Sequence, residues 1–244
     1  MPAKSSGSFS RRAVLFAAFR YSVPVLLGYS TIGIAFGLVL SGAGYPWPLA
    51  LVMSLWMYAG AAQFIAVGLF AAGTGLFEAC LVQLVVNARH IAYGLSMIKR
   101  FSGLGILKPY LVFSLTDETF ALLSSLPECR PGEEGERRLF IFYVAILNQC
   151  YWVTGSTIGA VAGSLIPFDM NGVGFALTAL FVVLMIEQIK KVKRPELFVV
   201  SGLAAALGVF LLPVKFSLLA ALTLALVLSP VVERKLNPGG GEGL

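Results

Sequence analysis

Eight mainly apolar runs follow one another along this chain of 244 residues, with little sequence between them. A helix that spans a membrane needs about 20 consecutive apolar residues, so most of these runs are long enough to cross a bilayer. They cover residues 19–40, 48–72, 77–98, 106–126, 140–165, 172–189, 196–212 and 216–232. We therefore predict an all-α polytopic membrane protein with seven or eight transmembrane segments.

Composition agrees with this class of protein, since 58% of the residues are hydrophobic and only 12% are charged, against about 25% charged residues in soluble domains. The net charge of +6 raises the question of nucleic-acid binding. However, the basic residues lie in short clusters between apolar runs, as on cytoplasmic loops. The three cysteines are far apart and the chain has a single histidine, so we expect neither a metal site nor a cofactor, and no nucleic-acid partner.

We divide the chain into a cytoplasmic tail (1–18), one integral membrane transport domain (19–232) and a disordered glycine-rich tail (233–244). Ser30–Gly37 aligns with Ser156–Gly163, which indicates two repeats, 19–126 and 139–232, as in many transporters. Chance likeness among glycine-rich helices is the alternative.

Charge patterning gives a conflicting orientation. The basic clusters at both ends and after residue 189 fit eight spans with both termini inside, whereas Lys99, Arg100 and Lys108 would then fall outside. Either the third or the fourth run is broken or re-entrant, or one of the spans is wrong. Pro24 also predicts a break in the first run.

The third run contains the most polar stretch, with Asn87, Arg89 and His90 among apolar residues. Ionisable groups at membrane depth usually face a cavity or a partner. Arg89 is the best candidate to bind a substrate carboxylate, because its planar fork matches that group; an ion pair with Asp117 or Glu118 is the alternative. His90 could carry a coupling proton or be a neutral core residue.

Two adjacent carboxylates, Asp117 and Glu118, lie well inside the fourth run. They could receive a substrate ammonium group or relay protons. Alternatively, they lie in the first turn of a short helix that starts after Thr116, where carboxylates are favourable.

Besides Arg89 and Asn87, three further polar or aromatic residues are candidates for substrate binding: Gln63, Asn148 and Trp152. The two amides could hydrogen-bond a zwitterion, and the indole could line an aliphatic pocket. Hydrogen bonds between helices and core packing are the alternative roles. The chain has no GxSxG, HExxH or phosphate-loop motif, so we do not expect an enzyme.

Four motifs occur in order: 28–37 with its glycines, Tyr58–Phe64 (YAGAAQF), Val86–Gly94 (VNARHIAYG) and Leu115–Leu122 (LTDETFAL). Their order and spacing resemble the AzlC/YgaZ family of branched-chain amino-acid exporters over residues 20–190. The resemblance implies the large subunit of an inner-membrane exporter that works with a small hydrophobic AzlD/YgaH-type subunit. It also implies valine, leucine and isoleucine as substrates, with methionine as a further candidate. Six polar residues occupy family positions: Gln63, Asn87, Arg89, His90, Asp117 and Glu118.

We combine these observations in one hypothesis, in which Arg89 and helix N-termini meet the substrate carboxylate and Asp117 or Glu118 meets the ammonium group. Proton transfer at an acidic residue or His90 would drive efflux. A carrier or channel for another small solute, an anion or a metal ion would use the same charged residues and is the alternative.

Overall fold

The computed structural model describes residues 10–127 and 134–165, together with isolated helical residues between 182 and 210. All regular elements in these ranges are helices. The contacts divide the chain into two compact units, one of 1–71 and 87–173 and the other of 72–86 and 174–244. The predicted runs after residue 165, and with them most of the second repeat, extend outside the described residues, as do residues 1–9 and the tail 233–244.

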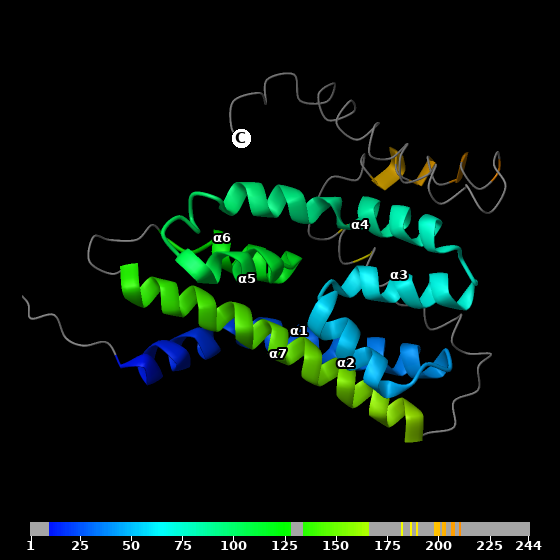
Figure 1. The fold of residues 1–244 in the computed structure, drawn as a ribbon, viewed down its shortest axis with the longest axis horizontal. Helices are drawn as coiled ribbons and strands as arrows, with labels where there is room; N and C mark the ends of the chain where they lie inside the picture. The colour runs from blue at the N-terminus through cyan, green and yellow to red at the C-terminus, as the bar shows by residue number, and fades with distance from the viewer. Residues whose placement is uncertain are drawn as a thin grey trace, which may run out of the picture. The chain divides into compact units, whose positions relative to one another are not determined.

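Two helices of 32 residues each, α1 (Arg11–Gly42) and α7 (Glu134–Leu165), lie side by side in the first unit (Figure 1). Each is about 48 Å long at 1.5 Å per residue. By length and composition, these two described helices could cross a membrane. Helix α1 begins at Arg11 and so includes residues 11–18 of the expected tail.

Glycines allow α1 and α7 to pack closely in the same direction. A Cβ atom on Gly37 would overlap the carbonyl oxygen of Ser156, and one on Gly159 would overlap that of Ile34. Close backbone approach at small residues is the usual basis of helix association in membranes. The two aligned segments, 30–37 and 156–163, therefore pack against each other. Parallel packing is compatible with parallel repeats, and the repeat itself stays a prediction.

The break expected at Pro24 is wrong, because α1 continues through this residue. Instead, the second run is broken into α2 (Trp47–Trp56) and α3 (Gly60–Ala71). Between them Tyr58 has φ +34°, a value that few non-glycine residues adopt. The start of α2 and the end of α3 lie close together, with the ring centres of Tyr45 and Phe70 5.7 Å apart. These helices form a hairpin.

The fourth run is broken as well, at residues 114–116. It forms a 3-10 turn η1 (Gly105–Leu107), α5 (Lys108–Phe113) and α6 (Asp117–Ser124). Arg100 donates hydrogen bonds of 2.7 Å to the carbonyl oxygens of Leu123 and Leu126, which holds the end of α6 beside the segment that leads into η1. This run is therefore a second hairpin.

Helix α4 (Leu76–Met97) coincides with the apolar run 77–98, and its first half belongs to the second unit. In the first unit, Met97, Phe101, Leu111, Leu123 and Val144 form part of one apolar core that joins α4, α5, α6 and α7.

With two hairpins in place of two continuous helices, several basic clusters of the described chain lie at one end of the first unit. Lys99 and Arg100 line one cleft together with Arg137 and Arg138 at the start of α7. Since α1 runs parallel to α7, the basic start of α1 lies at the same end of the unit. The predicted break in the third or fourth run is thus found in the fourth run, and the second run is broken too.

Candidate functional site

Helix α4 brings Arg89 to the first turn of α6. The Arg89 Nη1 donates to Asp117 Oδ2 at 2.7 Å, and the Tyr93 hydroxyl donates to Asp117 Oδ1 at 2.6 Å. The Arg89 and Asp117 side chains keep 37% and 26% of their surface exposed, so the pair remains accessible. The buried Nε of Arg89 has no hydrogen-bond partner among the described residues. Of the two expected roles of Arg89, the ion pair is present, and a donor remains for a ligand.

Asn87 and His90 lie on the same helix, one turn from each other. His90 Nδ1 is 3.2 Å from the carbonyl oxygen of Asn87, and its ring meets the Tyr93 ring edge-on at 5.7 Å. Tyr93 in turn stacks on Phe120 with ring centres 4.5 Å apart. The half-buried imidazole is therefore held beside the ion pair through Tyr93.

Glu118 belongs to a separate hydrogen-bonded group. Its Oε2 accepts from the Tyr29 hydroxyl at 2.7 Å, and the same hydroxyl is 2.6 Å from Thr116 Oγ1. Thr116 caps α6 by accepting from the backbone N–H of Thr119 at 3.2 Å, as expected for a threonine that precedes a helix. The alternative that both carboxylates lie in the first turn of a helix that starts after Thr116 is confirmed.

Asn148 of α7 reaches the same group. Its Nδ2 donates to Thr119 Oγ1 at 3.0 Å, while its buried Oδ1 has no partner among the described residues. Buried polar atoms are nearly always hydrogen-bonded. An amide with one unmatched atom, bonded to Thr119 beside the Thr116 cap, is a candidate contact for a polar ligand.

The two chain breaks lie next to each other. The Tyr58 and Phe113 rings, from the breaks before α3 and at the end of α5, have centres 6.3 Å apart. The buried Tyr58 hydroxyl lies near Tyr29, Thr119 and Glu118, although it makes no hydrogen bond of standard geometry with a described residue. Residues from both broken runs and from α1 therefore converge at one place.

A pocket of about 550 Å³ opens beside the breaks, within the range of 300–1,000 Å³ typical of small-molecule sites. Its polar lining residues are Tyr58, Asn87 and His90. The rest of the lining is mainly apolar: Met57, Ala59, Ile91, Gly94, Leu95, Ile98, Val112 and Phe113.

Gln63 and Trp152 are joined to each other rather than to this pocket. The indole N–H donates to Gln63 Oε1 at 2.7 Å, and Gln63 Nε2 donates to Ser54 Oγ at 3.2 Å. Both side chains are buried, with 0% and 3% of their surface exposed. The indole also covers Gly60, whose Cβ would lie 2.9 Å from it. In this conformation the pair connects helices, which was the alternative expectation for both residues.

Two functional candidates were missed as site residues, Tyr29 and Tyr58. Both occur inside the family-like motifs, so their positions were visible. Their hydroxyl groups gave no signal, because tyrosine in an apolar run is ordinarily an apolar side chain with a polar tip.

Similarity to known proteins identifies the family of this chain. The sequence pattern described as AzlC protein matches residues 24–166, which include both broken hairpins and the Arg89–Asp117 pair. The chain belongs to the AzlC family. No solved structure matches this chain.

Relatives in the AzlC family cover most of the chain. A protein of Helicobacter pylori (strain 26695), named an uncharacterized membrane protein, is 40% identical over 89% of this chain and 94% of its own. The branched-chain amino acid transport protein AzlC of Bacillus subtilis (strain 168) is 33% identical over 88% of this chain and 87% of its own. The inner membrane protein YgaZ of Escherichia coli K12 is 31% identical, with 82% and 83% covered.

Proposed function

We propose that this chain transports branched-chain amino acids out of the cell, as the large subunit of a two-component exporter in the cytoplasmic membrane. The observation that carries the proposal is the position of Arg89, whose buried Nε is unpartnered while its Nη1 binds Asp117, beside two adjacent helix breaks. The name of the Bacillus subtilis relative supports this substrate class.

The substrate carboxylate binds Arg89 and a helix N-terminus. A guanidinium binds a carboxylate through charge-assisted hydrogen bonds, and transporters commonly direct the N-terminus of a broken helix at an anionic substrate group. Helix α3 begins at Gly60, immediately after the break that lines the pocket. Its first backbone N–H groups supply the second set of donors.

The substrate ammonium group binds an acidic residue at the start of α6. In the structure Asp117 is paired with Arg89. When the zwitterionic substrate binds, this ion pair is replaced by two others, one between Arg89 and the substrate carboxylate and one between Asp117 and the substrate ammonium group. Glu118 and the unmatched Oδ1 of Asn148 are further acceptors in the adjoining group. The aliphatic side chain occupies the pocket lined by Ile91, Val112 and Phe113, where burial of each CH₂ contributes about 0.8 kcal/mol.

Substrate roles for Asn87, Gln63 and Trp152 remain part of the proposal. Asn87 lines the pocket and is positioned to contact the substrate directly. Gln63 and Trp152 lie behind the break, where they hold the start of α3 against α7. They contact substrate only if the hairpin moves during transport.

Proton coupling involves Asp117, Glu118 and His90. Neutralising a carboxylate would weaken its hold on an ammonium group, which releases the substrate on the side where the proton concentration is higher. His90 lies beside the ion pair through Tyr93. Retained stimulation of efflux by an imposed pH gradient in Asp117→Asn, Glu118→Gln and His90→Ala variants would remove the coupling part of the proposal.

We further propose a membrane arrangement that is based on the two hairpins. Helices α1, α4 and α7 cross the bilayer, while α2–α3 and α5–α6 enter from opposite sides and return. Irregular backbone is tolerated at membrane depth where it lines a cavity or is buried in protein. The basic residues at the shared end then all lie in the cytoplasm, in agreement with the positive-inside rule.

The experiment is efflux of preloaded labelled valine from cells that lack other exporters. Cells receive this chain alone, this chain with a small hydrophobic AzlD-type subunit, or both with Arg89→Gln. We expect rapid efflux only when both proteins are present and Arg89 is intact. If valine stays inside in every strain although the protein reaches the membrane, the substrate class is wrong, and a carrier for another solute, an anion or a metal ion replaces it.

A further inference from the structure

A second cleft, of about 630 Å³, lies in the first unit where α4 ends and α7 begins. One wall is formed by residues between 96 and 104 and the other by residues between 134 and 141. Four of its lining residues are basic and one is acidic. The full lining consists of Ser96, Lys99, Arg100, Ser102, Leu104, Glu134, Arg137, Arg138 and Ile141. No residue of this cleft belongs to the proposed transport site.

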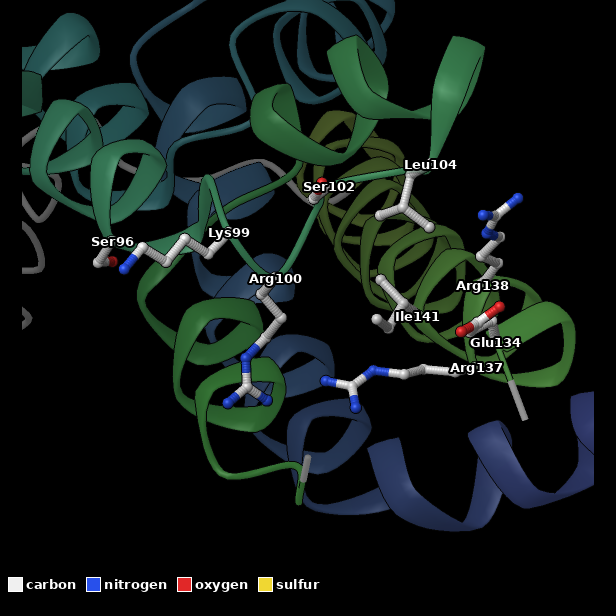
Figure 2. Close-up of a pocket in the computed structure, with 9 residues that line it drawn as sticks. All are labelled: Ser96, Lys99, Arg100, Ser102, Leu104, Glu134, Arg137, Arg138 and Ile141. Atoms are coloured by element: carbon white, nitrogen blue, oxygen red, sulfur yellow. The ribbon is translucent and has the colours of Figure 1, made fainter. Parts of the chain in front are cut away.

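Two guanidinium groups are held in place at this cleft. Arg100 Nη1 donates to the carbonyl oxygens of Leu123 and Leu126 at 2.7 Å, and Arg137 Nη1 donates to that of Pro127 at 2.9 Å. Figure 2 shows Arg137 extending from α7 toward Arg100 across the cleft. Neither group forms an ion pair with a described residue. Because each guanidinium has five N–H donors, both keep donors for an anion.

Two apolar residues, Leu104 and Ile141, line the same cleft. Ile106, two residues after Leu104, has 94% of its surface exposed. A cationic cleft with adjacent aliphatic residues has the two chemistries of a phospholipid, a phosphate group and acyl chains. A free phosphate ion has no acyl chains that could contact the aliphatic residues.

We propose that this cleft binds a phosphate group, specifically that of an anionic phospholipid. The phosphate meets Arg100 and Arg137, since guanidinium forks match phosphate oxygens, while Lys99 and Arg138 add charge at the rim. The acyl chains leave the cleft past Leu104 toward the exposed Ile106. Basic pockets on the cytoplasmic side of membrane proteins bind anionic headgroups in this way.

The test is native mass spectrometry of the full-length protein with phosphatidylglycerol or phosphatidylcholine, each with and without millimolar inorganic phosphate. Arg137→Gln/Arg138→Gln is compared with Arg11→Gln/Arg12→Gln. The second variant is a matched control, because it removes an adjacent arginine pair from the first turn of the neighbouring α1, outside the cleft.

We expect the wild type and the α1 variant to prefer phosphatidylglycerol, and the α7 variant to bind it about 30-fold more weakly, from about 1 kcal/mol for each arginine. Arg137→Lys/Arg138→Lys keeps both charges but loses the guanidinium forks, so it should bind between the wild type and the Gln variant, and it controls for misfolding. Equal losses in both Gln variants, or no preference for phosphatidylglycerol, would overturn the site. Full displacement of the lipid by inorganic phosphate would show that free phosphate is the ligand and overturn the lipid assignment.

Discussion

Arg89 of α4 and Asp117 of α6 form a 2.7 Å ion pair between a continuous helix and the first turn of a broken one. We predict that Arg89→Gln and Asp117→Asn each lower thermal stability, because each leaves an uncompensated charge in a low-dielectric setting. The double variant should lose less than the sum of the two, with a coupling of about 0.5–3 kcal/mol. Thermal unfolding of the purified protein measures this coupling. Arg20→Gln, at an exposed position of α1, is the control. Strictly additive losses would mean that the pair contributes nothing.

The contact between α1 and α7 gives a second prediction. Gly37→Ala and Gly159→Ala should each destabilise the fold by about 1–3 kcal/mol, since the added Cβ would overlap rigid backbone. Gly68→Ala in α3, with no neighbour within 4 Å of the new atom, should be neutral or slightly stabilising, as alanine is the better helix former. Thermal melting curves of the variants, followed by size-exclusion chromatography after heating, distinguish the destabilised proteins from the Gly68→Ala control. A fold as stable with Gly37→Ala as with Gly68→Ala would show that the helices are not in close contact.

Topology is testable with single cysteines in a background where Cys80, Cys129 and Cys150 are replaced by serine. With two re-entrant hairpins, Ala71→Cys should react with an impermeant thiol reagent from outside, and Ser102→Cys only from the cytoplasm. Eight simple spans predict the reverse for both positions. Both residues are exposed in turns or at helix ends, so accessibility reports the side of the membrane directly.

A further prediction distinguishes a structural role of the Gln63–Trp152 pair from direct contact with the substrate. Trp152→Phe removes the donor to the buried Gln63 Oε1 and should cost about 1–3 kcal/mol of stability. Trp56→Phe is the matched control, because Trp56 is 79% exposed and should tolerate the change. If the pair only connects helices, the KM for valine stays the same in Trp152→Phe. A raised KM with unchanged stability would instead identify direct substrate contact.

Several features were predictable because they depend on local sequence. The cap at Thr116 follows from a threonine before two acidic residues, and the bounds of α4 follow from the length of its apolar run. The ion pair between Arg89 and Asp117 was one of two expected roles, since a buried cation needs an anion in reach.

The two hairpins were harder to predict, because an apolar run of about 20 residues has the same composition whether it crosses the membrane or turns back. Tyr58 is not a helix-breaking residue, and the break beside it depends on Gly60 packing under Trp152, about 90 positions away in sequence. At Pro24 the error was the opposite, because a break was predicted there and the helix is continuous. The missing hydrogen bond of a proline is tolerated within a packed membrane helix, and α1 continues against α7.

The central claim is that Arg89 and the breaks beside it recognise both charged groups of a branched-chain amino acid. The most direct measurement is labelled valine uptake into proteoliposomes that contain the purified chain with its small subunit, in wild-type and Arg89→Gln forms. Unlabelled leucine, isoamylamine and 4-methylpentanoate serve as competitors, since the last two each lack one charged group. We predict that leucine alone competes well and that Arg89→Gln lowers uptake at least about tenfold, the loss of one charge-assisted contact. Equal competition by isoamylamine, or full uptake by Arg89→Gln, would contradict the claim.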